Sequence, residues 1–329
     1  MSVAFDFDEE FYREETRCGF TVPELMKRCW GSQLKVLQEF DRVCSKYSLK
    51  WFAFVGTLLG AVRHGGFIPW DDDVDIAMLR EDYTKFLSVA PTELPNGYVI
   101  INYNKDDHNY DCLTRVTNSR NILFDPEKAG KFCGFPFPAG IDLYPMDYVV
   151  ADEEERRIHK EIHFKIHQTT ELCAKILGGA GSQRDKDGNH LEPSEMLAEV
   201  SMMTGYEFDL EKDILRQLNI LLDMTDSINT YEESAYVANM GHLTFEEEKM
   251  MFPKECFDSA LSVPFETGRV YIPEGYGTVL KQNFGPDFMK PVNRPSHDYP
   301  YYSSQQDIVR EYIKKHPGEI PESWIQKYL

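Results

Sequence analysis

The segment GTLLGAVRHGGFIPWDDDVDI, residues 56–76, joins a glycine turn to a dense run of carboxylates. It follows a short apolar run at residues 51–55 that is rich in strand-forming residues. The glycine and threonine that open the segment interrupt this run, and residues 58–63 have the pattern of a short helix. Residues 74–78 are apolar again. The segment therefore predicts strand, turn, helix and a second strand, with carboxylates where the second strand begins.

Four of the five residues from 71 to 75 are aspartates, and we call this segment the aspartate run. The charges of the four carboxylates repel one another. If residues 73–76 are extended, alternate side chains share a face, so Asp73 and Asp75 point the same way. A divalent cation relieves that repulsion, and carboxylate oxygens with room for substrate phosphates suit Mg²⁺ or Mn²⁺. The pattern predicts Asp73 and Asp75 as metal ligands and catalytic residues.

A third carboxylate, Asp142, lies between Ile141 and Leu143 in a second apolar run, predicted as a strand at residues 140–147. Such a strand could lie beside the one that carries Asp73 and Asp75. Three acids on neighbouring strands can hold two metal ions, which can activate an attacking hydroxyl and stabilise the leaving oxygen of a phosphoryl transfer. We therefore predict Asp142 as a metal ligand or catalytic base.

A substrate phosphate that binds near these acids needs hydrogen-bond donors and positive charge around it. Gly56 and Thr57 stand at a strand-to-helix turn, where the backbone can approach a ligand closely and N–H groups of a helix start are available. Arg63 and Arg115 are candidate clamps for phosphate. These four residues are predicted to bind substrate.

Two other interpretations of the aspartate run remain open. An isolated acidic run can be a solvated loop. Asp71, Asp73 and Asp75 also match the first ligand positions of an EF-hand, but Ile76 stands where that loop requires glycine and Asp82 where glutamate is usual. The glycine turn upstream and Asp142 downstream favour the phosphoryl-transfer site over both.

Residues 56–76 closely resemble the signature of the LicD-type phosphocholine transferases, a branch of the nucleotidyltransferase fold superfamily that includes fukutin-related transferases. The superfamily pattern is a Gly-Ser or Gly-Thr turn, two acids alternating with hydrophobic residues, and a third acid on a later strand. Residues 141–147, IDLYPMD, resemble the second motif of the family, with Tyr144 where phenylalanine is more usual. Residues 276–277 and 285–294 look more loosely like its closing segment. The resemblance covers residues 40–150 and 250–297.

This resemblance implies a transferase that moves phosphocholine from CDP-choline to a sugar hydroxyl of a glycan or glycan precursor, releasing CMP with the help of Mg²⁺. Other CDP-alcohol donors, with ethanolamine, ribitol or glycerol, remain alternatives. So do a nucleotidyltransferase acting on nucleic acid and a catalytically silent nucleotide-binding module. The residues alone support metal-assisted phosphoryl chemistry and name neither cytidine nor choline.

Aromatic residues near the aspartate run could form a cage for the quaternary ammonium of choline. Trp70 and Tyr144 are the candidates, although packing in the core is the commoner role for such residues. Together with His64, they complete a predicted substrate-binding set of Gly56, Thr57, Arg63, His64, Trp70, Arg115 and Tyr144.

Charge and composition exclude several classes. The 329 residues carry 35 Lys plus Arg and 55 Asp plus Glu, a formal net charge of −20, so a nucleic-acid partner is disfavoured. The seven cysteines form no CxxC pair, which argues against a disulfide framework or a zinc finger. The first residues lack a basic, apolar signal peptide, and no apolar run approaches the roughly 20 residues of a membrane span. We expect a cytoplasmic protein without stable membrane insertion, with a position peripheral to the membrane as the alternative.

The predicted fold is α/β or α+β, with a nucleotidyltransferase-like mixed sheet flanked by helices. Residues 1–150 form the predicted catalytic core, with an N-terminal helix at residues 23–47. Residues 151–240 form a helical region of unassigned role, with helices at 152–176 and 195–226 around a glycine- and charge-rich linker. Residues 241–329 are predicted to pack back on the core.

Three histidines recur every four residues within the first of these helices, so they form one stripe. His159, His163 and His167 could bind zinc at this spacing, given a further ligand. Because Ile158, Ile162 and Ile166 mark an apolar face beside them, we favour a solvated, mutually paired flank.

Overall fold

The computed structural model describes residues 3–102, 113–179, 183–184, 190–245, 247–293 and 299–329. The chain forms two compact units. The first comprises residues 1–100, 115–143 and 257–329, and the second comprises residues 101–114 and 144–256. In the described part of the chain, no helix combines the length and the apolar character needed to cross a membrane. The predicted division into three regions at residues 150 and 240 stays a prediction.

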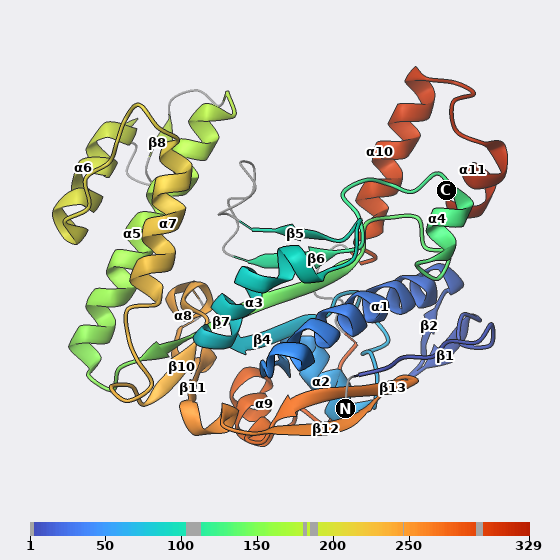
Figure 1. Ribbon diagram of the computed structural model, residues 1–329, viewed down its shortest axis with the longest axis horizontal. Helices are drawn as coiled ribbons and strands as arrows, with labels where there is room; N and C mark the ends of the chain where they lie inside the picture. The colour runs from blue at the N-terminus through green and yellow to red at the C-terminus, as the bar shows by residue number, and fades with distance from the viewer. Residues whose placement is uncertain (1–2, 103–112, 180–182, 185–189, 246, 294–298) are drawn as a thin grey trace. The chain divides into compact units, whose positions relative to one another are not determined.

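The first unit begins with a hairpin and a long helix and ends with a hairpin and three helices (Figure 1). Its elements are β1 (Glu15–Arg17), β2 (Phe20–Val22), α1 (Glu24–Tyr47), β3 (Phe52–Ala53), α2 (Val55–Arg63), β4 (Asp75–Leu79), α3 (Arg80–Glu93), β5 (Val99–Ile101), β6 (Thr114–Thr117), α4 (Pro126–Gly130), the start of β7 (Gly140–Val149), β12 (Ala260–Phe265), β13 (Gly268–Pro273), α9 (Tyr276–Phe284), α10 (Tyr302–Lys315) and α11 (Glu322–Tyr328).

The sheet of this unit places β4 between β3 and β7. Strands β3 and β4 are antiparallel, with Phe52 opposite Ala77. Strand β6 pairs with both β7 and β5. Helices α2 and α3 pack against β4, and α1 packs against α3. The predicted mixed sheet flanked by helices is confirmed, and β4 and β7 are the strands that carry Asp75 and Asp142.

Helix α1 supplies much of the core of this unit. It starts after Pro23, and its apolar side chains, including Leu34, Leu37 and Phe40, are fully buried. It ends at Ser48, which adopts a left-handed backbone conformation with φ +58°. The N-terminal helix predicted at residues 23–47 is therefore confirmed.

The second unit consists of a helical cluster and the rest of the sheet. Its elements are the end of β7, α5 (Glu153–Leu177), β8 (Gln183–Arg184), β9 (His190–Leu191), α6 (Pro193–Thr204), α7 (Ile214–Asp226), β10 (Tyr236–Ala238), α8 (Met240–Phe245), the 3₁₀ turns Glu247–Met250 and Lys254–Phe257, the second of which ends in the first unit, and β11 (Met251–Pro253). Strand β10 lies between β7 and β11, antiparallel to both.

Helices α5, α6 and α7 pack together in this second unit (Figure 1). Their shared core includes Ile166, Val200 and Leu218, each fully buried. The single helix predicted at residues 195–226 is wrong, because Gly205 ends α6 in a left-handed conformation at φ +73° and α7 begins at Ile214. The linker predicted after α5 lies largely outside the described residues.

Candidate active site

The aspartate run is bound to its neighbours through its backbone. The N–H of Asp75 donates a hydrogen bond of 2.9 Å to Oγ1 of Thr57, in the first turn of α2. The N–H of Asp142 donates to the carbonyl of Val74, also at 2.9 Å. The predicted third acid therefore lies on β7, next to β4, the strand that begins at Asp75, just after Asp73 and Val74.

The turn into α2 brings the backbone against a carboxylate. A Cβ atom on Gly56 would lie 2.5 Å from Oδ2 of Asp71, so only glycine fits there without displacing that side chain. Val55, just before it, has φ +38°, which is an unfavourable conformation for a β-branched residue. Strain of this kind is usually retained where the surrounding structure requires it, and functional sites are common locations. Gly56 and Asp71 thus form one tightly packed corner.

A cavity of about 630 Å³ opens beside this corner, within the first unit. Five of the predicted site residues line it: Gly56, Arg63, Trp70, Asp73 and Asp75. Residues from the C-terminal part of the chain complete its wall, namely Phe284, Asp287, Phe288, Lys290 and Val292. The cavity therefore combines carboxylates, two cations and several apolar side chains.

A second, smaller cavity of about 340 Å³ lies in the same unit, and most of the residues that line it have polar side chains. Its lining includes Asp73, Asp142 and Arg115, together with Gln305 from α10. Asp73 lines both cavities. The two predicted metal ligands Asp73 and Asp75 therefore meet in the larger cavity, while Asp73 and Asp142 meet in the smaller one.

Arg115 forms an ion pair with Asp142, with Nε 3.3 Å from Oδ1. Both side chains are partly exposed, at 34% and 24%, so solvent screens the pair. Their exposure also leaves both groups accessible from the cavity. Arg115 is therefore placed to meet an anionic group bound next to Asp142.

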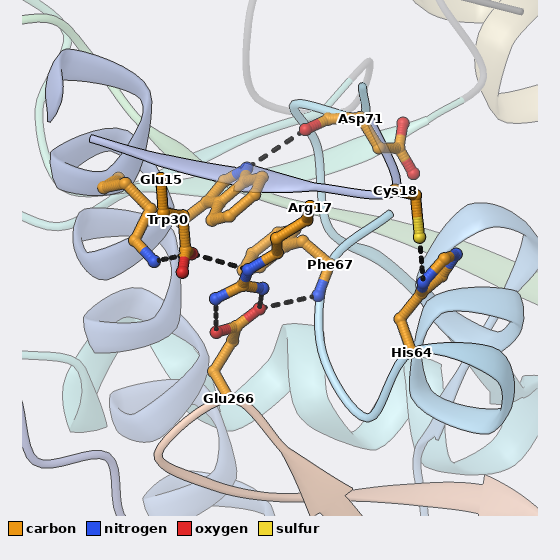
Figure 2. Close-up of polar contacts among 9 residues, drawn as sticks. Glu15, Arg17, Cys18, Trp30, His64, Phe67, Asp71 and Glu266 are labelled. Carbon is orange, nitrogen blue, oxygen red and sulfur yellow. Dashed lines mark hydrogen bonds and ion pairs between the residues drawn. The ribbon is translucent and has the colours of Figure 1, made fainter. Parts of the chain in front are cut away.

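Arg63 and His64 follow α2 and contact each other. Nε of Arg63 donates to Nε2 of His64 at 2.9 Å, and Nη1 donates to the carbonyl of Phe288 at 2.9 Å. Burial lowers the pKa of Arg63, and burial together with the neighbouring Arg63 lowers the pKa of His64. Figure 2 shows His64 next to Cys18, with Nδ1 3.9 Å from Sγ. Arg63 thus binds the C-terminal segment to α2, and His64 is not among the residues that line either cavity.

Tyr144 belongs to the second unit, whereas Trp70 belongs to the first. The ring of Tyr144 lies 5.2 Å from that of His242, and Tyr144 is not among the residues that line the two cavities of the first unit. Trp70 is 6% exposed and its ring contacts that of Phe20. The predicted choline cage therefore has one of its two aromatic residues in the larger cavity.

Asp71 is a site residue that the sequence analysis did not select. Burial raises its pKa well above the ordinary value, and the adjacent charges of Asp73 and Asp72 raise it further. Carboxylate oxygens of these three aspartates lie within 4.8 Å of one another. Crowded, partly buried carboxylates of this kind fit a divalent cation that prefers oxygen ligands. The alternation that selected Asp73 and Asp75 could also have selected Asp71.

The histidine stripe of α5 is not the solvated flank that we predicted. His163 is fully buried, and its Nδ1 lies 2.8 Å from Oδ1 of Asp226 on α7. Conversely, Ile158, expected on the apolar face, is 44% exposed. The reason is that α5 packs against α7 and α8 as well as α6, so a wider part of its circumference is covered.

Comparison with known proteins shows which family this chain is similar to. Residues 48–177 match a family described as LicD/FKTN/FKRP, nucleotidyltransferase domain. Lipopolysaccharide cholinephosphotransferase LicD of Haemophilus influenzae is 25% identical over 265 residues, 78% of this chain and 88% of its own length. Human ribitol 5-phosphate transferase FKRP is 37% identical over 81 residues, 21% of this chain and 16% of its own.

An uncharacterized protein of Rickettsia typhi is 39% identical over 122 residues, 37% of this chain and 36% of its own length. The mixed sheet flanked by helices and the match of residues 48–177 thus indicate a nucleotidyltransferase-type domain. More specifically, residues 48–177 match the nucleotidyltransferase domain of the LicD family. The family model covers the glycine turn, the aspartate run and Asp142.

Proposed function

We propose that this protein transfers phosphocholine from CDP-choline to a sugar hydroxyl of a glycan or glycan precursor and releases CMP. The observation that carries the proposal is the position of Asp73 in the walls of two cavities. The larger cavity has the size, the cations and the apolar surface to take a nucleotide donor. The smaller cavity reaches Asp142, and polar side chains such as Arg115 and Gln305 on its wall suit a hydroxyl acceptor.

The proposed reaction forms a bond between the acceptor oxygen and the phosphorus of choline phosphate, while the bond from that phosphorus to the bridging oxygen of CMP breaks. The proton of the hydroxyl passes to a carboxylate, for which Asp142 is the candidate. Asp73 and Asp75, with Asp142, would hold Mg²⁺ or Mn²⁺, which when bound offsets the charge of the phosphates. Arg115 and the first turn of α2 at Gly56 and Thr57 orient anionic groups.

Choline as the alcohol rests on the similarity to LicD, which extends over most of both chains. The similarity to the ribitol 5-phosphate transferase FKRP favours CDP-ribitol as the second candidate donor, over a shorter stretch. CDP-ethanolamine and CDP-glycerol require the same chemistry. The presence of all three acids argues against a catalytically silent module.

The proposal is tested by incubating the protein with CDP-choline, Mg²⁺ and a panel of acceptors: free sugars, oligosaccharides and a glycolipid. We expect CMP release that an acceptor stimulates, together with an added mass of phosphocholine on that acceptor. Transfer of the CMP group itself to the acceptor would contradict the proposal and indicate a nucleotidyltransferase. No CMP release from any CDP-alcohol, with folded protein and every acceptor, would indicate a silent module.

A further inference from the structure

The aspartate run is also held from the side of α1. The indole Nε1 of Trp30 donates a hydrogen bond of 3.0 Å to the carbonyl of Asp71, and Nε2 of Gln33 donates one of 2.7 Å to the carbonyl of Asp72. The two donors lie three residues apart, on one face of the helix. Trp30 is fully buried and Gln33 is 2% exposed. Consecutive carbonyls of the run are therefore fixed by two rigidly packed side chains.

The orientation of the Trp30 ring is itself determined by its surroundings. The indole ring of Trp30 stacks on the ring of Phe67, with centroids 4.5 Å apart and planes 3° apart (Figure 2). The guanidinium of Arg17, at the end of β1, lies 5.5 Å from the centroid of the Trp30 ring. Arg17 in turn donates two hydrogen bonds, of 2.6 and 2.9 Å, to Glu266. A ring held in this way has little freedom to move away from the Asp71 carbonyl.

Glu266 connects this stack to the loop before the aspartate run. Its carboxylate accepts the N–H of Phe67 at 2.9 Å, and a Cβ on Gly66 would lie 2.2 Å from it (Figure 2). Glu266 has φ +48° and its side chain is only 4% exposed. A buried carboxylate is stable there because Arg17 neutralises it and the Phe67 N–H is a further donor. The chain from residue 66 to residue 72 is thus fixed at both ends.

We propose that Trp30 and Gln33 are positioning residues for the metal-binding carboxylates. Neither is assigned as a ligand. Each fixes a backbone carbonyl within the run, and the direction of the Asp71 and Asp73 side chains follows from that backbone. Groups that orient ligands in this way commonly change metal affinity by about 10- to 100-fold when they are removed. The inference on metal affinity rests on the proposed function, whereas the inference on backbone order does not.

Trp30→Phe is the sharpest test, because it removes the indole N–H and keeps an aromatic ring on Phe67. The chain offers a matched control in Trp51, which is 2% exposed and whose Nε1 donates to Oδ1 of Asp41 at 2.8 Å. Trp51→Phe removes the same kind of buried hydrogen bond, yet Trp51 lines neither cavity. If Trp30 only stabilised the fold, the two variants should show the same metal affinity and the same hydrogen exchange.

Two measurements on metal-free protein distinguish the roles. Titration with Mn²⁺, followed by electron paramagnetic resonance, should show affinity lowered about tenfold in Trp30→Phe and within about twofold of wild type in Trp51→Phe. Hydrogen exchange of the amides from 71 to 76 should be faster than in wild type in Trp30→Phe and unchanged in Trp51→Phe. Gln33→Met, which keeps the side-chain length and removes the donor, should act like Trp30→Phe and replaces it if that variant does not fold.

Equal Mn²⁺ affinity and equal exchange in the two tryptophan variants would overturn the inference. If wild type binds no Mn²⁺, the metal site of the proposed function fails, and the exchange measurement alone decides whether Trp30 positions the run. Slower or unchanged exchange at residues 71–76 in Trp30→Phe would then contradict the proposal.

Discussion

The backbone N–H of Asp75 and the hydroxyl of Thr57 are joined by a buried hydrogen bond of 2.9 Å. Thr57 is 3% exposed and Asp75 is 5% exposed, so water does not replace this bond readily. The bond couples the first turn of α2 to the first residue of β4. Thr57 therefore fixes the backbone that carries the Asp75 carboxylate. It also lies at the helix start where we predict that a phosphate binds.

Thr57→Val should lower the free energy of unfolding by about 1–3 kcal/mol, because the buried N–H of Asp75 is left without an acceptor. Thr57→Ser keeps the oxygen and should stay within about 1 kcal/mol of wild type. Urea unfolding of both variants checks this difference. Equal losses for the two variants would show that the methyl group of Thr57, and not its oxygen, matters.

Gly56→Ala should displace Asp71, since its Cβ would lie 2.5 Å from Oδ2 of that residue. Misplacement of a group in an active site by about 1 Å can cost about 10²-fold in rate, so we expect kcat/KM to fall at least about tenfold. Gly130→Ala is the control, because a Cβ there meets no atom within 4 Å. Wild-type kcat/KM in Gly56→Ala would contradict the packing that we describe.

The stability of the second unit should depend on pH through His159. Burial lowers its pKa and the neighbouring His163 adds to this, although Asp226 and a hydrogen bond with the backbone of Thr225 act in the opposite direction. A lowered pKa means that the unfolded chain takes up the proton more readily. The stabilisation is therefore present above about pH 6.5 and is lost as the pH falls through the folded-state pKa.

His159→Gln should consequently lose less stability than wild type between about pH 7.5 and about pH 5. Urea unfolding at both ends of that range measures the difference. His316→Gln, at an exposed site, should behave like wild type. A wild-type pH dependence in His159→Gln would show that its ring does not titrate differently on folding.

Much of the fold was predictable because each element has its own local signal. The helix at residues 23–47 has a proline start and a regular apolar face, and it is α1. The break at Gly205 was missed because apolar residues continue on both sides of it. The burial of His163 was not predictable, since it depends on α7 and α8 packing against the polar side of α5.

In the candidate site, too, the residues with a local sequence signal were the predictable ones. Asp73 and Asp75 line one cavity because the alternation of side chains along an extended segment is a local property, and Asp142 stands on the neighbouring strand β7, where it lines the smaller cavity with Asp73. The contributions of Phe288, Lys290 and Gln305 come from more than 140 residues further along the chain, and their sequence has no comparable pattern. Such contacts depend on tertiary structure and could not be predicted from spacing.

Donor choice should favour CDP-choline over CDP-ribitol and CDP-glycerol, with CDP-ethanolamine as the nearest competitor. Contact of a cation with an aromatic face contributes about 0.5–2 kcal/mol, which corresponds to roughly tenfold discrimination. Trp70→Leu should therefore reduce kcat/KM for the cationic donors more than for the polyol donors. Because the ratio between donors is compared within one variant, a general loss of activity does not affect it.

Tyr144→Leu, in the second unit, tests the other predicted member of the cage with the same four donors. Equal losses for every donor in both variants would remove the cage. A polyol donor that wins by tenfold or more in wild type would contradict the choline assignment and leave the CDP-alcohol transferase class intact.

The aspartate run is proposed as a metal-dependent transfer site, and the decisive measurement is CMP release from CDP-choline after chelation. We expect release to stop with chelator, to return with Mg²⁺ or Mn²⁺ and to return poorly with Zn²⁺, because the proposed ligands are all oxygen. Asp73→Asn and Asp75→Asn should each lower the restored rate at least about 10²-fold, while Asp152→Asn, at the exposed start of α5, should not. Wild-type rates in both site variants, or full activity in chelator, would contradict the account.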